Sequence, residues 1–391
     1  NLHGRNYELA KAEADKVDEQ IIEVLQAGHS FRVEAGAGSG KTYSLNKVIE
    51  WIQSNKGAEY SRKTQNVICI TYTNAAVNVI AERLSKDSFI LPSTIHSFAW
   101  NAIKQYQSFL INIVTNDPDF LPDEGDFLKI TEVTYTLGHR YKENGIQYLY
   151  HDDVLKLFCT LLDNAKFRRV FSDKYPLILI DEYQDTSVNV IKIMKTLDDY
   201  AKSRKRNFIV GYFGDSVQNI YTDGVGNQLN TLHPGLKQIS KEFNWRSRAE
   251  IITVANRIRN DEIQQVPIDD KYIGGTVKFY HGAGNQESSF IKKYQNKWED
   301  VHVFSFKNEE IAELSGFKNL YNVFKKVYSG NKYDLLTSEL LSKDLKKLGK
   351  VQLTLYRLLY EKIHFQSSMI SENVPSFHLP IRISKDSNDI F

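Results

Sequence analysis

A glycine-rich loop near the N-terminus is the segment whose residue types and spacing most directly indicate chemistry. It follows the short strand-like run FRVEA and precedes a helical pattern. Its backbone N–H groups can approach phosphate oxygens closely because the side chains are small, and the following helix adds the positive end of its dipole. The loop therefore predicts a phosphate site, against the alternative of a glycine-rich turn that holds no nucleotide. The predicted nucleotide-binding residues are Ala35, Gly36, Ala37, Gly38, Ser39, Gly40, Lys41 and Thr42.

Two adjacent carboxylates supply the second half of the predicted site. Asp181 and Glu182 follow the apolar run LILI, so a strand would deliver them at its carboxyl end, where α/β sheets bind ligands. Lys41 is expected to reach the β- and γ-phosphates of ATP, and Thr42 and Asp181 are expected to bind Mg²⁺. Glu182 fits the group that orients or deprotonates the attacking water. The chemistry predicted from these residues is magnesium-dependent ATP hydrolysis.

The loop and five further segments resemble, in family order, the signatures of UvrD/Rep/PcrA-type superfamily 1 DNA helicases. The resemblance extends over roughly residues 17–320 and implies a RecA-like fold and a DNA-dependent ATPase. The five segments are DEYQDT from Asp181, VICITYTNAAVNVIAERL from Val67, STIHSFAW from Ser93, FGDSVQNIY from Phe213, and FNWRS from Phe243 with the later Ala255-Asn256.

The same resemblance assigns further nucleotide contacts. Gln20 lies 21 positions before Lys41, the family's spacing for a glutamine that reads adenine, although an exposed helix glutamine is the alternative. Trp245 stands where a tyrosine usually stacks on adenine, and Tyr43 replaces a frequent arginine over the other face of the base. Arg246 matches an arginine finger that neutralises charge on the γ-phosphate. Gln218 matches the residue that senses the γ-phosphate and couples it to DNA.

Four positions match DNA contacts of the family. Tyr72 and Tyr221 match aromatic residues on which bases of single-stranded DNA stack. Asn74 and His96 lie in motifs near the path of the strand. For each of the four, a packed or hydrogen-bonded core residue is the alternative.

The elements that must position these residues alternate between strand and helix. A helix is expected over residues 5–29, and strands are expected at FRVEA, VICITYT, LILID and NFIVGYFGD. Such alternation predicts an α/β P-loop fold, with a RecA-like parallel sheet and helices on both faces. The first predicted domain is a motor domain over 1–100 and 169–265, and it is interrupted by an inserted, mostly helical subdomain over 101–168. Residues 270–330 are predicted to start a second RecA-like motor domain. Residues 331–391 are predicted to be helical and to start a second inserted region.

Two departures from the family pattern bear on function. After Tyr221 the chain continues Thr222-Asp223-Gly224, where the family has an aromatic residue and an arginine. This change predicts a weaker or differently built grip on DNA. Nothing after the strand-rich stretch that begins near Thr276 resembles family motifs V and VI. Either the chain is a trimmed part of a longer protein or its motor has degenerated, and Asn1 in place of a methionine favours the expectation of trimming.

Composition sets outer limits. The chain has 391 residues, 41% of them hydrophobic and 25% charged, and it shows no signal peptide and no apolar run long enough for a membrane span. Two cysteines, Cys69 and Cys159, are too few for disulfide bonds to stabilise a protein of this size, so we expect a reducing, cytoplasmic setting. The net charge of +2 does not indicate nucleic acid, and the basic run over 202–206 is expected to be a solvated surface turn.

Two functions of different classes remain open. The leading one is an ATP-dependent DNA helicase that moves along single strands and unwinds duplex, with 3′ to 5′ polarity implied by the resemblance. The alternative is an ATP-gated regulatory or scaffold subunit that acts with a nuclease partner in phage defence or DNA repair. A small-molecule kinase or GTPase is disfavoured by the DEYQDT run. The intact set Lys41, Asp181, Glu182, Gln218 and Arg246 favours the motor.

Overall fold

The computed structural model describes residues 7–279, apart from short gaps at 86–87, 123, 126–127, 137–139, 220–223, 260, 262 and 270, and a few isolated residues further on. The chain divides into two compact units, Asn1–Tyr280 and His281–Phe391. The predicted strand near Thr276 is wrong for residues 276–279, which belong to no strand. The rest of the predicted second motor domain is described only at isolated residues, and residues 331–391 lie outside the described residues.

Six parallel strands form the main sheet of the first unit, in the order β10-β1-β9-β8-β2-β3. The four strands predicted for this sheet, β1, β2, β8 and β9, are confirmed. The strands β3 and β10 were not predicted, because β3 contains a proline and β10 carries charged and polar residues. Their bounds are β1 Phe31–Ala35, β2 Val67–Thr71, β3 Ile90–Thr94, β8 Leu177–Asp181, β9 Ile209–Gly214 and β10 Lys237–Lys241.

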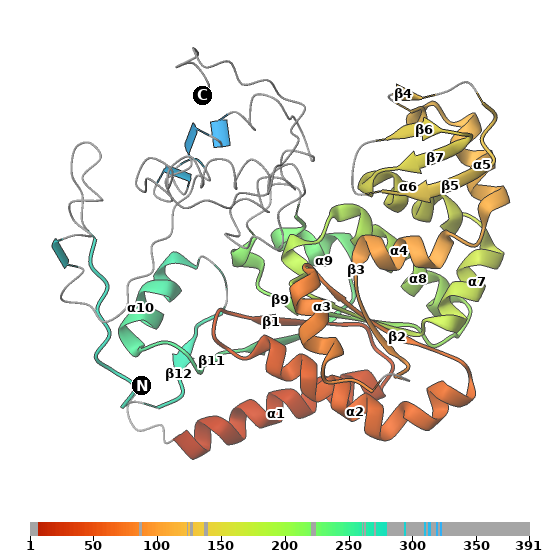
Figure 1. Cartoon of the computed structure of the whole chain (residues 1–391). Coiled ribbons are helices and arrows are strands. Elements are labelled where there is room, and N and C mark those ends of the chain that lie inside the picture. The colour runs from red at the N-terminus through yellow and green to blue at the C-terminus, as the bar shows by residue number, and fades with distance from the viewer. Residues whose placement is uncertain are drawn as a thin grey trace, which may run out of the picture. The chain divides into compact units, whose positions relative to one another are not determined.

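Helices cover both faces of this sheet. Successive residues of a strand point to opposite faces, and the buried strand residues accordingly divide between two cores. Cys69 and Leu179 pack in one core with α1 and α2, whereas Ile70 and Ile180 pack in the other with α4, α6, α7 and α8. Figure 1 shows α1 and α2 on one side of the sheet and α7 and α8 on the other. The fold is therefore the predicted RecA-like parallel sheet between two layers of helices. The helix bounds are α1 Tyr7–Gln26, α2 Lys41–Arg62, α3 Asn74–Ala81, α4 Ile95–Ile103, α6 His151–Leu162, α7 Ala165–Lys174 and α8 Val188–Ser203.

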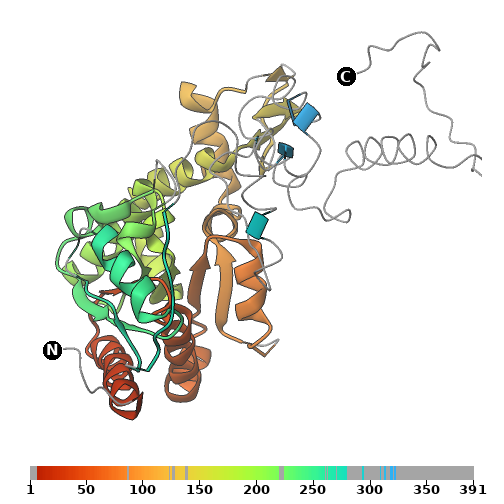
Figure 2. The same cartoon turned by 90° about the vertical axis from the view of Figure 1, so that its left-hand side faces the viewer.

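The segment between α4 and β8 contains a small sheet of its own. Four short strands pair in the order β4-β6-β7-β5, beside α5. The prediction of a mostly helical insertion did not include this sheet, because strands of two to four residues leave too short an alternating pattern to detect. In Figures 1 and 2 it lies beyond α4, away from α1 and α2. The bounds are α5 Gln107–Asn116, β4 Glu124–Gly125, β5 Glu132–Tyr135, β6 Tyr141–Glu143 and β7 Ile146–Leu149.

The last part of the first unit returns to the main sheet. After β9 and β10, the chain forms a two-residue parallel pair, β11 with β12, and a helix, α10. None of the helices in the described part of the chain combines the length and apolar character needed to cross a bilayer. The remaining bounds are α9 Leu229–Leu232, β11 Phe243–Asn244, α10 Ala249–Ile258 and β12 Val266–Pro267, with 3-10 turns at Pro118–Phe120, Tyr183–Asp185, Ser216–Gln218 and Gly226–Gln228.

Candidate nucleotide site

The glycine-rich loop leaves the carboxyl end of β1 and ends at α2, which begins at Lys41. Gly38 and Gly40 adopt φ angles of 79° and 82°, in the left-handed region that favours glycine. A Cβ atom at Gly38 would also lie 2.7 Å from Asn244 Oδ1 and 2.9 Å from the Cβ of Arg246. Glycine is thus required both by the backbone and by a later segment that packs against the loop.

That later segment holds the loop carbonyls. Asn244 donates to the carbonyl oxygen of Ala37 at 2.7 Å, and Gln265 donates to the same oxygen at 3.1 Å. The backbone N–H of Trp245 donates to the carbonyl oxygen of Gly38 at 2.8 Å. Because β10 is the neighbour of β1, the chain that continues from β10 passes directly over the loop. The orientation of the loop is therefore fixed by residues about 200 positions later in the sequence.

Lys41 and Glu182 meet at the carboxyl edge of the sheet. Lys41 Nζ lies 2.8 Å from Glu182 Oε2, in a partly exposed ion pair. β1 and β8 are separated by β9, so their ends are about 10 Å apart, a distance that the long lysine side chain can cross. Glu182 adopts a left-handed φ of 50°, unusual for a residue other than glycine, where the chain turns sharply after β8. The two predicted halves of the site are brought together here.

Asp181 lies next to this pair, half-buried at the end of β8. Burial and the neighbouring Glu182 carboxylate raise the pKa of Asp181 to about 6, while Lys41 opposes the shift. Thr42 is exposed in the first turn of α2. A carboxylate and a hydroxyl are the oxygen donors that Mg²⁺ prefers, so their chemistry fits the predicted metal role.

Asp215, at the end of β9, links the predicted γ-phosphate sensor to the carboxylate pair. Gln218 Nε2 donates to Asp215 Oδ2 at 2.6 Å, and the backbone N–H of Asp215 donates to Gln184 Oε1 at 3.0 Å. Gln184 Nε2 in turn donates to Glu182 Oε2 at 2.8 Å. A continuous chain of hydrogen bonds thus runs from Gln218 to Glu182.

Arg259, after α10, anchors that chain. Its guanidinium lies 2.8 Å from Asp215 Oδ2 and also pairs with Asp261, and these carboxylates raise its pKa. Arg259, Gln184 and Asp215 are not among the site residues predicted from the sequence. Gln184 and Asp215 lie inside quoted signatures and could have been found there, whereas no local pattern marks Arg259.

Glu34, Asp215 and Asp261 place carboxylate oxygens within 4.8 Å of one another. Each already has a cationic partner, since Arg32 pairs with Glu34 and Arg259 pairs with the two aspartates. The backbone N–H of Ser216 also donates to Glu34 at 2.7 Å. We therefore interpret this cluster as a set of buried ion pairs that brace the site.

A hollow of about 360 Å³ opens beside the loop, between α1 and the start of α2. Two predicted base-stacking residues, Tyr43 and Trp245, line it, and Tyr7 packs edge-on against Trp245 with ring centroids 6.0 Å apart. The size and the aromatic residues suit a nucleotide base. The lining residues are Tyr7, Lys11, Ala14, Asp15, Asp18, Ser39, Gly40, Tyr43, Lys241 and Trp245.

Gln20 does not line this hollow. It is exposed on α1, two residues and therefore about 200° around the helix from Asp18. Asp18 faces the hollow instead, buried against Lys241 Nζ at 2.6 Å and Lys47 at 3.2 Å. The helix that carries Gln20 borders the hollow, but the register of α1 turns a different polar side chain, Asp18, towards it.

Arg246 is exposed directly beside the loop, and its backbone N–H donates to Asn244 Oδ1 at 2.9 Å. Its Cβ would contact a side chain at Gly38, which places the guanidinium within reach of the predicted phosphates. Among the predicted nucleotide contacts, the structure thus brings the loop, Tyr43, Trp245, Arg246 and Glu182 to one edge of the sheet.

The predicted DNA contacts fall in different environments. Tyr72 is 49% exposed directly after β2, and Asn74 is exposed at the start of α3. His96 is partly buried, with its ring centroid 4.4 Å from that of His151, and burial lowers its pKa to about 4. These contacts favour a packing role for His96. Tyr221 and the altered residue Asp223 lie outside the described residues.

This chain is similar in sequence to one protein family model and to several known proteins. A model of the family described as "AAA domain" matches residues 18–224. The Gabija protein GajB of Bacillus cereus (strain HuB5-5) is 33% identical, over 93% of this chain and 66% of that protein. The ATP-dependent DNA helicase Rep of Buchnera aphidicola subsp. Acyrthosiphon pisum is 24% identical, over 79% of this chain and 53% of its own length.

The ATP-dependent DNA helicase PcrA of Staphylococcus aureus (strain Mu50 / ATCC 700699) is 23% identical, over 60% of this chain and 38% of that protein. Among solved structures, the Pif1 helicase of Candida albicans matches with a TM-score of 0.30 and 14% identity, over 57% of this chain and 39% of that one. The chain spans between 38% and 66% of the length of these three curated relatives.

Proposed function

The chain belongs to the AAA domain family and is homologous to the UvrD-type helicases Rep and PcrA, and from that premise we propose that it is the ATP-hydrolysing part of a DNA motor. In the complete protein this motor would move along single-stranded DNA, in the 3′ to 5′ direction, and unwind duplex. The observation that carries the proposal is the meeting of Lys41 with Glu182, 141 positions apart, at the mouth of a glycine loop.

The loop and Lys41 would bind the phosphates of ATP. The 2.8 Å contact between Lys41 and Glu182 occupies both groups in the present arrangement. A γ-phosphate would draw Lys41 away, since phosphate carries more negative charge than one carboxylate. Glu182 could then accept a proton from the attacking water. Mg²⁺ held by Thr42 and Asp181 would offset charge on the phosphate oxygens.

The hydrogen-bond chain from Gln218 through Asp215 and Gln184 to Glu182 could transmit the presence or absence of a γ-phosphate to other parts of the site. A γ-phosphate that attracted the Gln218 amide would remove its 2.6 Å bond to Asp215. Arg259 and the backbone N–H of Val217 would still hold Asp215 and keep Gln184 positioned against Glu182. We infer that Gln218 couples phosphate binding to the edge of the sheet where Tyr72 and Asn74 are exposed to single-stranded DNA.

The assignment of domains is part of the same proposal. Residues 1–100 and 169–265 would form the first motor domain, and 101–168 an insertion into it. Residues 270–330 would open a second motor domain, which supplies the other wall of the ATP cleft, and residues 331–391 would begin a second insertion. We propose a cytoplasmic setting for the complete protein.

An ATP-gated subunit that works with a nuclease in phage defence or DNA repair is the second candidate. Identity to the Gabija protein GajB is 33%, against 24% for Rep, which favours a role other than that of Rep. The presence of Asp223 after the FGDSVQNIY segment favours it as well, because an aspartate repels the DNA backbone. In this case ATP binding would act as a switch.

Steady-state ATP hydrolysis by the full-length protein, with single strands of increasing length, tests the proposal. A motor that translocates should show turnover that rises with strand length to a plateau, because each binding event then supports more steps. The same assay on residues 1–391 measures what the first motor domain achieves with only the proposed start of the second motor domain. ATP binding without stimulated turnover in the full-length protein would contradict the motor and leave the ATP-gated subunit.

A further inference from the structure

A second group of charged residues lies at the opposite edge of the main sheet from the candidate nucleotide site. Lys63 leads into β2, Lys174 leads into β8, and Arg206 leads into β9. Because these three strands are parallel neighbours, the three connections arrive at the same amino edge. The glycine loop lies at the carboxyl edge, a strand length of about 16 Å away for five residues.

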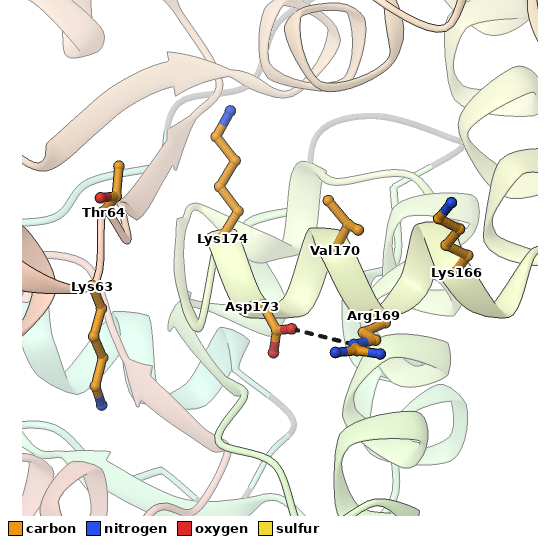
Figure 3. A pocket seen from close by; sticks show the side chains of 7 residues that line it. All are labelled: Lys63, Thr64, Lys166, Arg169, Val170, Asp173 and Lys174. Atoms are coloured by element: carbon orange, nitrogen blue, oxygen red, sulfur yellow. Dashed lines mark ion pairs between the residues drawn. The ribbon is translucent and has the colours of Figure 1, made fainter.

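A hollow of about 390 Å³ opens at this amino edge. Most of its wall is one stripe of α7, whose members recur at helical spacing. Figure 3 shows Lys166, Val170 and Lys174 along one margin of this stripe and Arg169 and Asp173 along the other, with Lys63 and Thr64 beyond the carboxyl end of the helix. We call these seven residues the amino-edge hollow.

Basic side chains dominate the hollow. Its one acidic residue, Asp173, is shared between Arg169 at 3.9 Å and the neighbouring Arg206, with which it forms an ion pair. In the described part of the chain, Lys166 and Lys174 form no ion pair with a carboxylate, and both are exposed. Arg206 ends the basic run over 202–206, which lies at the exposed end of α8 and the turn that follows. The hollow therefore carries excess positive charge towards solvent.

The frame that carries these charges is fixed. Gln65 Nε2 donates to the carbonyl oxygen of Asp173 at 2.7 Å. The backbone N–H of Asn66 donates to the carbonyl oxygen of Lys174 at 2.8 Å. The opposite face of α7 buries Phe167 and Phe171 in the core. The cations are thus presented from a helix that is packed on the core and held at its carboxyl end.

The composition of the hollow identifies its ligand. Protein–protein interfaces are anchored by aromatic and apolar residues and are depleted in lysine, whereas the apolar lining here is the single residue Val170. Single-stranded nucleic acid needs aromatic platforms for its bases, and the seven lining residues include none. A duplex backbone requires only lysine and arginine side chains, without apolar anchors and without aromatic platforms. We propose that the amino-edge hollow is a second nucleic-acid site, which holds the phosphate backbone of duplex DNA.

This site goes beyond the proposed motor. Phosphate contacts carry no information about base sequence, so binding would be independent of sequence and strongly dependent on salt. The hollow shares no residue with the predicted ATP site. Duplex binding there should therefore need no nucleotide.

Fluorescence anisotropy of the full-length protein with a labelled 20-base-pair blunt duplex tests the proposal, without nucleotide and over a range of salt concentrations. The variant is Lys166→Ala/Lys174→Ala. The matched control is Lys16→Ala/Lys192→Ala, two exposed lysines on α1 and on the first half of α8. At about 0.1 M salt we expect the variant to bind duplex roughly tenfold or more weakly, and its salt slope to fall by about 2, since each phosphate contact contributes about 0.9.

The control variant should match the wild type, and a single strand of equal length should bind both variants as it binds the wild type. Unchanged duplex affinity and salt slope in Lys166→Ala/Lys174→Ala would overturn the site. An equal loss for single strand and duplex would overturn the choice of duplex. A polyglutamate peptide that bound the hollow more tightly than the duplex would overturn the choice of nucleic acid. Repeating the titration with Lys41→Ala separates this test from the motor, because only the motor requires Lys41.

Discussion

The two edges of the main sheet differ in whether their charged side chains are paired and buried or exposed to solvent. At the carboxyl edge, Lys41, Glu182, Asp215 and Arg259 are joined by ion pairs and hydrogen bonds, and Asp215 is fully buried. At the amino edge, the lysines of the hollow face solvent, and Lys166 has no carboxylate partner among the described residues. One edge resembles a preorganised reaction site, and the other a binding surface.

The difference follows from the cost of burying charge. A buried carboxylate is tolerated only with a cation or several donors, so the carboxyl edge requires partners from distant segments. An exposed lysine costs little and contributes to binding by displacing counterions from DNA. Substitutions at the carboxyl edge should therefore change turnover, and those at the amino edge should change salt-dependent affinity.

The largest effect is expected from Lys41→Ala. Loss of the ammonium removes the charge that holds the β- and γ-phosphates, so DNA-stimulated ATP turnover of the full-length protein should fall by about 10²-fold or more. Duplex binding at the amino edge should not change. Turnover assays alongside urea unfolding check this, with Lys16→Ala as the control. Normal turnover in Lys41→Ala would remove the phosphate role of the loop.

Glu182→Gln should be nearly as severe. The amide keeps the shape of the side chain but cannot accept a proton from water, so turnover should fall by about 10²–10⁴-fold. ATP should still bind and become trapped, which a filter-binding assay with labelled ATP would detect. The control is Glu50→Gln, an exposed position on α2. Normal turnover would mean that another group activates the water.

Arg246→Ala and Arg206→Ala compare the two edges directly. Arg246 lies beside the loop, so its loss should lower kcat by about 10²-fold and affect ATP affinity less, because the charge acts mainly in the transition state. Arg206→Ala should leave kcat unchanged and weaken duplex binding, because a positive charge beside the hollow would be lost and Asp173 would keep only Arg169 as a partner. Single-turnover kinetics and ATP binding separate these effects. If both substitutions lowered kcat alike, the two edges would not be functionally distinct.

Tyr72→Ala should weaken single-strand binding by about 1–3 kcal/mol, the usual value of one base stacked on an aromatic ring. Tyr72→Phe should retain the affinity, since the ring is preserved. Anisotropy with a labelled single strand checks both variants. An unaltered affinity for Tyr72→Ala would assign this residue to packing alone.

The smallest effect is expected from acid. Burial lowers the pKa of His96 to about 4 from an ordinary value near 6.5, and burial also lowers the pKa of its neighbour His151. Their neutral forms stabilise the fold fully above about pH 6.5, and this stability is lost as the pH falls from there towards 4. For His96 the loss at pH 5 should be about 1–2 kcal/mol.

Urea unfolding at pH 7 and pH 5 measures this loss. His96→Gln should lose less stability than the wild type between the two pH values, whereas His29→Gln, at an exposed position before β1, should behave as the wild type. Equal losses in all three proteins would exclude His96 as the acid-sensitive group. Duplex binding at the amino edge should change little over the same range, because lysine and arginine remain charged.

Sequence patterns predicted the elements that are long and regular. The runs FRVEA and LILID are strands with the predicted bounds, because a glycine loop directly after one and a carboxylate pair at the end of the other leave little choice of where each strand ends. The short strands of the insertion were missed, since two to four residues carry too little periodicity. Gln20 lies on the helix that borders the hollow, but the rotation of that helix turns Asp18 towards the hollow instead.

The sequence by itself determined the glycine loop, the Asp181-Glu182 pair and their attachment to strands, because these depend on backbone freedom and on local hydrophobic runs. The tertiary structure alone decided which distant residues converge on them. The strand order puts Asp215 between Glu182 and the loop, brings Arg259 against it, and gathers Lys63, α7 and Arg206 at the other edge. Strand order results from the packing of the whole domain, and no local pattern of residues encodes it.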